Sequence, residues 1–434
     1  MTISSRALAG ALALVFIVPA AVTAQTRRNP FTDLFGRSPD RTGREFTSVQ
    51  LRSEAGAQWG TTLKEEFLEP GTRLPDGLAA GADLSMIGYY VRDRVQMRGQ
   101  GRYSYQEYRQ PQAFGAPAYD GGGHVNLQAT TRLSFQGGGR FTRSPFYHLV
   151  WLAPEQFAPM QPVDRAAIVM MENDTIEGSA GATSNYTKRS SLSITGHVRE
   201  TRFARRPQFD LSSRGARGQW KRQLTRDMAV RAGYGREEMR HRPEGVERLF
   251  VNEIFDVGVD YAQALSLARR TTFSFATETS MVRENAGPKR FRINGHVMLE
   301  RHFQRTWIAQ LSGHRTTEFL PGFRSPVFTE RAQASLAGYL APRLLLNMNA
   351  SGGQGQAGFS DPRKFISYQG DAKVTVAVTR HLGVFTQYVY HHFQSPPDPQ
   401  AMFAFPRVAR QAVSVGVQTW ISLIDKDKVT SDPR

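Results

Sequence analysis

Apolar and polar residues alternate one by one along several long stretches of this chain. In 95–105 every odd position is apolar, aromatic or glycine, and every even position is glutamine, arginine or serine. The same alternation occurs in 49–59, 291–299 and 413–421. Because successive side chains of a β-strand point to opposite faces, each stretch predicts a strand with one apolar and one polar face.

Short polar segments that contain arginine separate these stretches into pairs. They lie at 91–95, 131–133, 187–190, 224–228, 267–271, 303–307, 340–344 and 378–382. From the third segment onward they recur at intervals of roughly 35 to 43 residues, which is typical of a repeated supersecondary unit. The repeated unit is predicted to be two long strands joined by a tight turn. Two strands around each break and one at either end of the series give about eighteen strands, with sixteen as the alternative.

Two other β architectures fit this pattern less well. A propeller blade has four short strands, whereas each unit here has two long ones. A soluble barrel buries its apolar side chains inside, but the interior of a barrel of eighteen strands is too wide for side chains to fill. The pattern therefore predicts an all-β fold, a transmembrane antiparallel β-barrel with short periplasmic turns and long extracellular loops.

The N-terminal residues have the features of a secretory signal. Arg6 precedes the apolar run 7–21, and small residues follow at 22–24. We expect a signal peptide at 1–24, a periplasmic tail at 25–45, the barrel at 46–424 and a C-terminal tail at 425–434, with a single anchor helix at the N-terminus as the alternative. Beyond the signal, no window has the ~18 consecutive apolar residues of a membrane helix. The expected location is the bacterial outer membrane.

Three segments carry a resemblance to a known class of protein. They are Leu224–Gly235, Leu267–Phe275 and the closing strand Val413–Leu423. They resemble hairpins of bacterial outer-membrane β-barrel proteins of the porin-like type, and are similar to barrels associated with exopolysaccharide systems. The resemblance covers about 46–424. It implies a channel for passive passage of small polar solutes, anions included, or alternatively a barrel accessory to surface polysaccharide secretion or anchoring.

Catalytic and metal-binding signatures are lacking, so neither an enzyme nor a bound cofactor is expected. The chain has no cysteine, which excludes thiolate metal sites and thiol nucleophiles. The Gly-x-Ser-x-Gly and His-Glu-x-x-His motifs do not occur, and the ten histidines are scattered. The hypothesis of an outer-membrane enzyme would require a Ser/His/acid cluster formed only in space.

If the apolar faces meet lipid, the polar faces line the lumen. The predicted pore-lining cations are Arg98, Arg102, Arg132, Arg217, Lys221, Arg231 and Arg292. Rings of arginine and lysine favour anions in a pore. The alternative is that these cations pair with inward acids such as Glu54, Asp83, Asp260 and Asp371 and only brace the wall.

The longest connection is predicted between 144 and 180. Its acidic residues are Asp164, Glu172, Asp174 and Glu177. Because the third outer loop of trimeric general porins folds inward, this segment is a candidate constriction loop; a surface flap is the alternative. The expected partners are outer-membrane lipids and glycolipid, the barrel-insertion machinery and, in the trimeric alternative to a monomer, two further copies of the chain. Nucleic acid is not an expected partner.

Overall fold

The computed structural model shows one antiparallel sheet of eighteen strands that closes on itself. It describes residues 45–66, 77–108, 114–147, 169–204, 207, 210–225, 227–241, 248–264, 271–284, 289–303, 306–319, 326–357, 363–394 and 407–428. The strands are β1 (Glu45–Glu66), β2 (Gly77–Arg92), β3 (Val95–Tyr108), β4 (Phe114–Gln128), β5 (Leu133–Tyr147), β6 (Val169–Thr187), β7 (Ser190–Phe203), β8 (Leu211–Gln223), β9 (Met228–His241), β10 (Arg248–Ala264), β11 (Thr271–Glu284), β12 (Arg290–Phe303), β13 (Trp307–Glu318), β14 (Val327–Ala341), β15 (Leu344–Ala357), β16 (Arg363–Ala377), β17 (Leu382–Gln394) and β18 (Arg407–Lys428). The predicted count of eighteen is confirmed.

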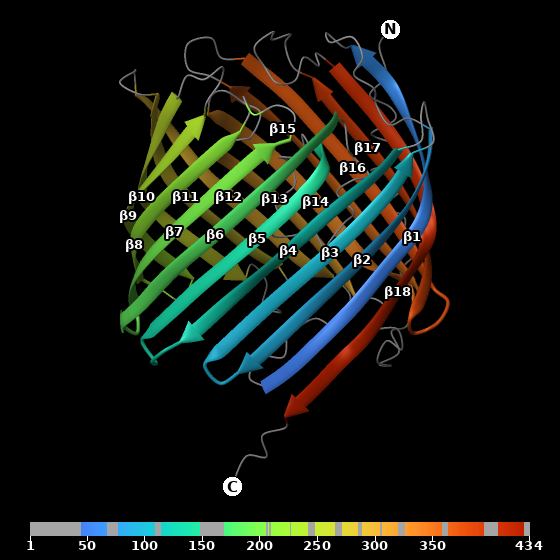
Figure 1. Ribbon diagram of the computed structural model, residues 1–434. Helices are drawn as coiled ribbons and strands as arrows, with labels where there is room; N and C mark the ends of the chain where they lie inside the picture. The colour runs from blue at the N-terminus through green and yellow to red at the C-terminus, as the bar shows by residue number, and fades with distance from the viewer. Residues whose placement is uncertain are drawn as a thin grey trace. The chain divides into compact units, whose positions relative to one another are not determined.

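The barrel closes between its first and last strands. Each strand pairs with its neighbour in sequence, and β1 pairs both with β2 and with β18, for example Ala55 with Ala82 and with Val417. Figure 1 shows β1 and β18 side by side in a wall of tilted strands. Closure leaves no strand edge with unpaired backbone groups, which is what a sheet needs in order to span lipid.

The predicted arginine-containing breaks coincide with the strand junctions at one end of the barrel. Three of them are two residues long: Asp93-Arg94 between β2 and β3, Lys188-Arg189 between β6 and β7, and Pro342-Arg343 between β14 and β15. Asp93 has a φ of 31°, and aspartate is among the few non-glycine residues that enter this region readily. In Figure 1 these short turns form the lower rim of the barrel.

Side-chain exposure alternates along the strands as predicted. On β17, Val384 and Tyr388 are 40% and 43% exposed, whereas Phe385 and Gln387 are 1% and 3% exposed. Large apolar side chains that remain exposed recur on the same face of other strands, as at Ile194 on β7. The outer wall is therefore apolar, and the opposite face of each strand lines the interior. Among the described residues, no helix is long and apolar enough to cross a membrane.

The predicted segment boundaries differ from the structure in two places. Strand β6 begins at Val169, so 169–180 belongs to the wall and only 148–168 lies between β5 and β6, outside the described residues. The outward positions Gly178, Ala180 and Ala182 are small, which weakens the hydrophobic alternation that would reveal this strand. At the other end, β18 continues to Lys428, so the strand includes the first residues of the predicted C-terminal tail.

The inner wall carries an apolar cluster as well as polar side chains, whereas the alternation alone predicts a polar lining throughout. Six apolar side chains from the ends of β8, β9, β10, β11, β13 and β14 form one buried cluster: Leu211, Met239, Phe250, Val282, Phe319 and Phe328. The rings of Phe250 and Phe319 have their centroids 6.4 Å apart. The cluster lies at the end of these strands opposite the short turns, so polar side chains line the inner wall mainly below it.

Candidate functional site: the charged inner wall

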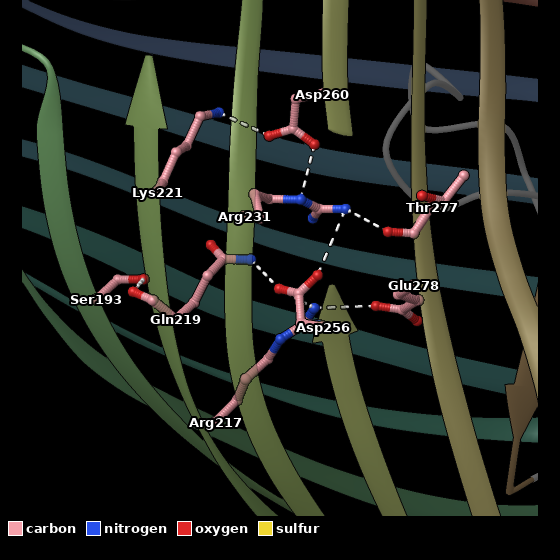
Figure 2. Close-up of polar contacts among 9 residues, drawn as sticks. All are labelled: Ser193, Arg217, Gln219, Lys221, Arg231, Asp256, Asp260, Thr277 and Glu278. Carbon is pink, nitrogen blue, oxygen red and sulfur yellow. Dashed lines mark hydrogen bonds and ion pairs between the residues drawn. The ribbon is translucent and has the colours of Figure 1, made fainter. Parts of the chain in front are cut away.

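Side chains of both signs from four neighbouring strands form a network on the inner wall of the barrel. Figure 2 shows them converging from β8, β9, β10 and β11. The charged members are Arg217, Lys221, Arg231, Asp256, Asp260 and Glu278. Three of the seven predicted pore-lining cations therefore lie in one cluster.

Each cation of this network pairs with at least one carboxylate. The distance from Lys221 Nζ to Asp260 Oδ2 is 2.8 Å, and from Arg231 Nε to Asp260 Oδ1 it is also 2.8 Å. Arg217 Nη2 lies 2.6 Å from Asp256 Oδ2 and 3.0 Å from Glu278 Oε2. Three positive and three negative side chains leave the network formally neutral.

Asp256 is the centre of the network, since its side chain is fully buried. It accepts contacts from Arg217 on one oxygen and from Arg231, at 3.5 Å, on the other. The side-chain amide of Gln219 also donates a hydrogen bond to it. Burying a carboxylate is costly unless it is paired and hydrogen-bonded, and these contacts supply both kinds of partner to Asp256.

The network lies where the pairing of β10 with β11 is interrupted. Phe255 pairs with Thr279 and Tyr261 with Phe275, so β10 carries two more residues than β11 over this interval. Arg231 Nη2 donates a hydrogen bond to the carbonyl oxygen of Thr277, 2.8 Å away, within the interrupted interval. An arginine side chain thus satisfies a backbone acceptor beside the break in the ladder. β-Bulges of this kind locally bend a strand and redirect its side chains.

A glycine opposite Arg231 makes this contact sterically accessible. Gly258 on β10 pairs with Arg231 on β9. A Cβ atom at Gly258 would lie 2.1 Å from the carbonyl oxygen of Thr277, the atom that accepts the Arg231 hydrogen bond. The missing side chain therefore lets β10 and β11 approach closely under the guanidinium group.

The remaining predicted pore-lining cations differ in their contacts. Arg102 is ion-paired, with its Nε 2.7 Å from Asp83 Oδ2 on the neighbouring strand β2. Arg98 lies over the ring of Tyr89, and Arg292 over that of Phe328 with a 3.3 Å hydrogen bond to Gln356. Arg132 lies in the exposed turn between β4 and β5. Within the described part of the chain, no carboxylate lies within ion-pair distance of Arg98, Arg132 or Arg292.

The acids assigned to a constriction loop lie elsewhere. Glu172, Asp174 and Glu177 are strand residues of β6. Glu172 and Asp174 both contact Arg143 on β5, on the same face as the exposed Ile176, so they belong to the outer wall. Only Glu177 faces inward, where it pairs with Arg199 of β7 at 3.1 Å. Asp164 lies outside the described residues.

Further ion pairs on the inner wall were not singled out from the sequence. Arg140 pairs with Asp120, and His197 with Glu237. An interior cavity of about 510 Å³ is lined by Arg140, by the His197–Glu237 pair and by the Arg199–Glu177 pair. Segment 317–319, at the end of β13, also lines it. In the sequence, these pairs are visible only as charges of opposite sign at inward positions of nearby strands. Such charges identify candidate ion pairs only once the strand register is known.

One ion pair joins strands that are far apart in sequence. Lys373 Nζ on β16 lies 2.7 Å from Glu54 Oε2 on β1 and 4.1 Å from the ring centre of Phe385 on β17. Glu54, like Asp83 and Asp260, is one of the acids expected to brace the wall. The fourth, Asp371, accepts a 3.3 Å hydrogen bond from the side-chain amide of Asn349.

Among the described residues, no group of three or more histidine, aspartate or glutamate side chains could hold a metal ion.

Comparison with known proteins gives similarity in structure only. No protein-family model and no curated protein matches the sequence.

Solved structures with a similar course of the chain include two from Pseudomonas aeruginosa. OpdL has a TM-score of 0.44 at 9% identity, over 87% of this chain and 99% of that one. OccK10 (OpdN) has a TM-score of 0.41 at 12% identity, over 87% and 99%. The FrpB iron transporter from Neisseria meningitidis (F3-3 variant) has a TM-score of 0.40 at 7% identity, over 90% and 83%.

The location of the protein follows from the geometry of its own wall. The closed sheet has no unpaired strand edge, its outward face carries the exposed large apolar side chains, and many of its charged side chains pair inside. This is the arrangement that a sheet requires in order to lie in lipid. The chain therefore forms a closed antiparallel β-barrel with the wall of a membrane-spanning barrel.

Proposed function

We propose that this protein is a passive channel for small polar solutes. The observation that carries the proposal is the inner wall, on which charged and hydroxyl-bearing side chains from several strands line an interior cavity of about 510 Å³. A charged side chain on the lipid face lowers the stability of a barrel by about 2–4 kcal/mol at mid-membrane, whereas a water-filled interior tolerates charge.

The pairing of the charges predicts a channel with weak charge selectivity. The network around Asp256 is formally neutral, and Arg102 is neutralised by Asp83. Three cations that have no carboxylate partner among the described residues, Arg98 and Arg292 on the wall and Arg132 at the short-turn rim, supply a modest preference for anions. A small polar solute, neutral or anionic, is therefore the substrate class that the inner wall favours.

Reconstitution of the refolded barrel in planar bilayers tests the proposal. We expect discrete conductance steps and, under a potassium chloride gradient, a reversal potential displaced slightly toward that of chloride. A correctly folded barrel that carries no ion current would refute the channel and leave the role accessory to surface polysaccharide. A strong cation preference would refute the assignment of the unpaired arginines.

A further inference from the structure

The short-turn end of the barrel contains a recess whose lining includes Arg132, one of the cations to which the channel's anion preference is assigned. A cavity of about 210 Å³ lies between the turns that follow β2 and β4 and the end of strand β6. Its lining consists almost entirely of polar side chains, among them Asp93, Arg94, Gln96, Asn126, Gln128 and Arg132. A volume of this size accommodates a single small polar group rather than a whole polymer.

Backbone hydrogen bonds hold the walls of this recess together. The amide of Gln128 donates to the carbonyl of Arg94 at 2.7 Å, and the amide of Asn185 donates to the carbonyl of Arg132 at 2.7 Å. Within the middle turn, Thr130 Oγ1 accepts hydrogen bonds from the amides of Arg132 and Leu133. The two turns and the end of β6 are therefore linked to one another, and the recess is formed before any ligand enters.

The recess is lined by two arginines and one carboxylate, that of Asp93, so its formal charge is +1. Arg94 donates only a long 3.4 Å hydrogen bond to the carbonyl of Ala129. Within the described part of the chain, no carboxylate lies within ion-pair distance of either Arg94 or Arg132. Further exposed cations on neighbouring parts of the same rim, Arg92, Lys188 and Arg189, add to the positive field.

We propose that this recess binds the oxyanion group of a small solute, a phosphate or a carboxylate, at the periplasmic mouth of the barrel. Two guanidinium groups supply charge-assisted hydrogen bonds to such a group, and the amides of Gln96, Asn126 and Gln128 supply neutral ones. The recess thus concentrates anions at one end of the conduit. Binding here does not depend on conduction, so it can be tested separately from the proposed channel.

The test is isothermal titration of the full-length barrel in detergent with inorganic phosphate, and in a second arm with acetate. We expect saturable phosphate binding, weakened about tenfold or more when Arg94→Gln and Arg132→Gln are combined. Arg380→Gln, which removes an exposed cation from the β16–β17 turn of the same rim, is the matched control and should bind like the unaltered protein.

The outcomes separate the possible ligands. Phosphate binding without acetate binding assigns the recess to phosphate, and binding of both assigns it to oxyanions in general. Absence of saturable binding, or equal loss in Arg380→Gln and in the double variant, would overturn the proposal. Because every variant changes an exposed turn, its heat-dependent gel mobility should match that of the folded barrel and thus verifies that a loss of binding is not a loss of fold.

Discussion

The guanidinium group of Arg231 on β9 reaches past β10 and donates a 2.8 Å hydrogen bond to the main-chain carbonyl of Thr277 on β11. The contact lies where β10 carries more residues than β11 and the ladder between them is interrupted. The same guanidinium pairs with Asp256 and Asp260. Arg231 therefore pairs with two inner-wall carboxylates and also bonds to β11 where the β10–β11 ladder is interrupted.

Replacing Arg231 by glutamine should lower the free energy of unfolding by about 2–3 kcal/mol. This is below the usual cost of breaking a buried pair, because Arg217 still neutralises Asp256. The measurement is guanidinium-induced unfolding of the barrel in micelles. Arg214→Gln is the control, since Arg214 makes an exposed pair with Glu238 and should cost about 1 kcal/mol or less. Equal effects of the two substitutions would contradict the special role of Arg231.

Replacing Gly258 by alanine should destabilise the barrel by about 2 kcal/mol or more. The added Cβ would lie 2.1 Å from the Thr277 carbonyl, so backbone must shift and the Arg231 contact is lost. Gly101→Ala is the matched control, because nothing lies within 4 Å of its added Cβ. That substitution should be neutral or stabilise by up to about 1 kcal/mol. The unfolding midpoints of the two variants test this prediction. A Gly258→Ala barrel as stable as the Gly101→Ala barrel would refute the close approach of β10 and β11.

Ion selectivity should respond to unpaired but not to paired charge. Removal of a unit charge about 10 Å from the ion path in water changes the electrostatic energy by about 0.4 kcal/mol. Because this energy changes in opposite directions for anions and cations, Arg98→Gln should lower the anion-to-cation permeability ratio about fourfold, as read from the reversal potential in a planar bilayer. The combined change Asp83→Asn and Arg102→Gln removes a neutral pair and should leave the ratio unchanged. A larger shift from the double change than from Arg98→Gln would show that the pair does not cancel in the pore.

The destabilisation caused by a charged side chain on the outer wall should depend on its depth in the membrane. Ile194 is 60% exposed in the middle of the apolar face of β7, and an Ile194→Arg barrel should be about 2–4 kcal/mol less stable in lipid vesicles. Leu224, 43% exposed in the turn after β8, lies near the membrane interface, where arginine should cost about 0–1 kcal/mol. Refolding equilibria in vesicles give both values. An equal cost at the two positions would place the hydrocarbon region elsewhere on the wall.

Much of the barrel was predictable because strands and tight turns are local features. The alternation over 95–105 identifies β3 and assigns Arg98 and Arg102 to its polar face from a few consecutive residues. Strand β6 was only partly recognised, since small residues such as Gly178 face lipid there and three acids suggest a loop. Its signal becomes clear only in register with the alternating neighbours β5 and β7.

The contacts made by the inner-wall charges could not be predicted in the same way. Sequence reasoning left open whether the arginines face a free lumen or pair with acids; the structure shows pairing for Arg102 and Arg231 and none with a described carboxylate for Arg98. Arg217 reaches Glu278 three strands away, and Lys373 reaches Glu54 at the opposite end of the sequence. Long side chains on a concave wall can span several strands, so pairing depends on curvature and register as well as on spacing.

The amino-acid order by itself determined the strand number, the positions of the turns and the face on which each side chain lies, because these depend on a period of two and on short polar breaks. Tertiary structure decided how β1 meets β18, where β10 carries extra residues beside β11, and which opposite charges touch. Those features depend on the closure of the sheet, which brings together residues from strands that no local pattern relates.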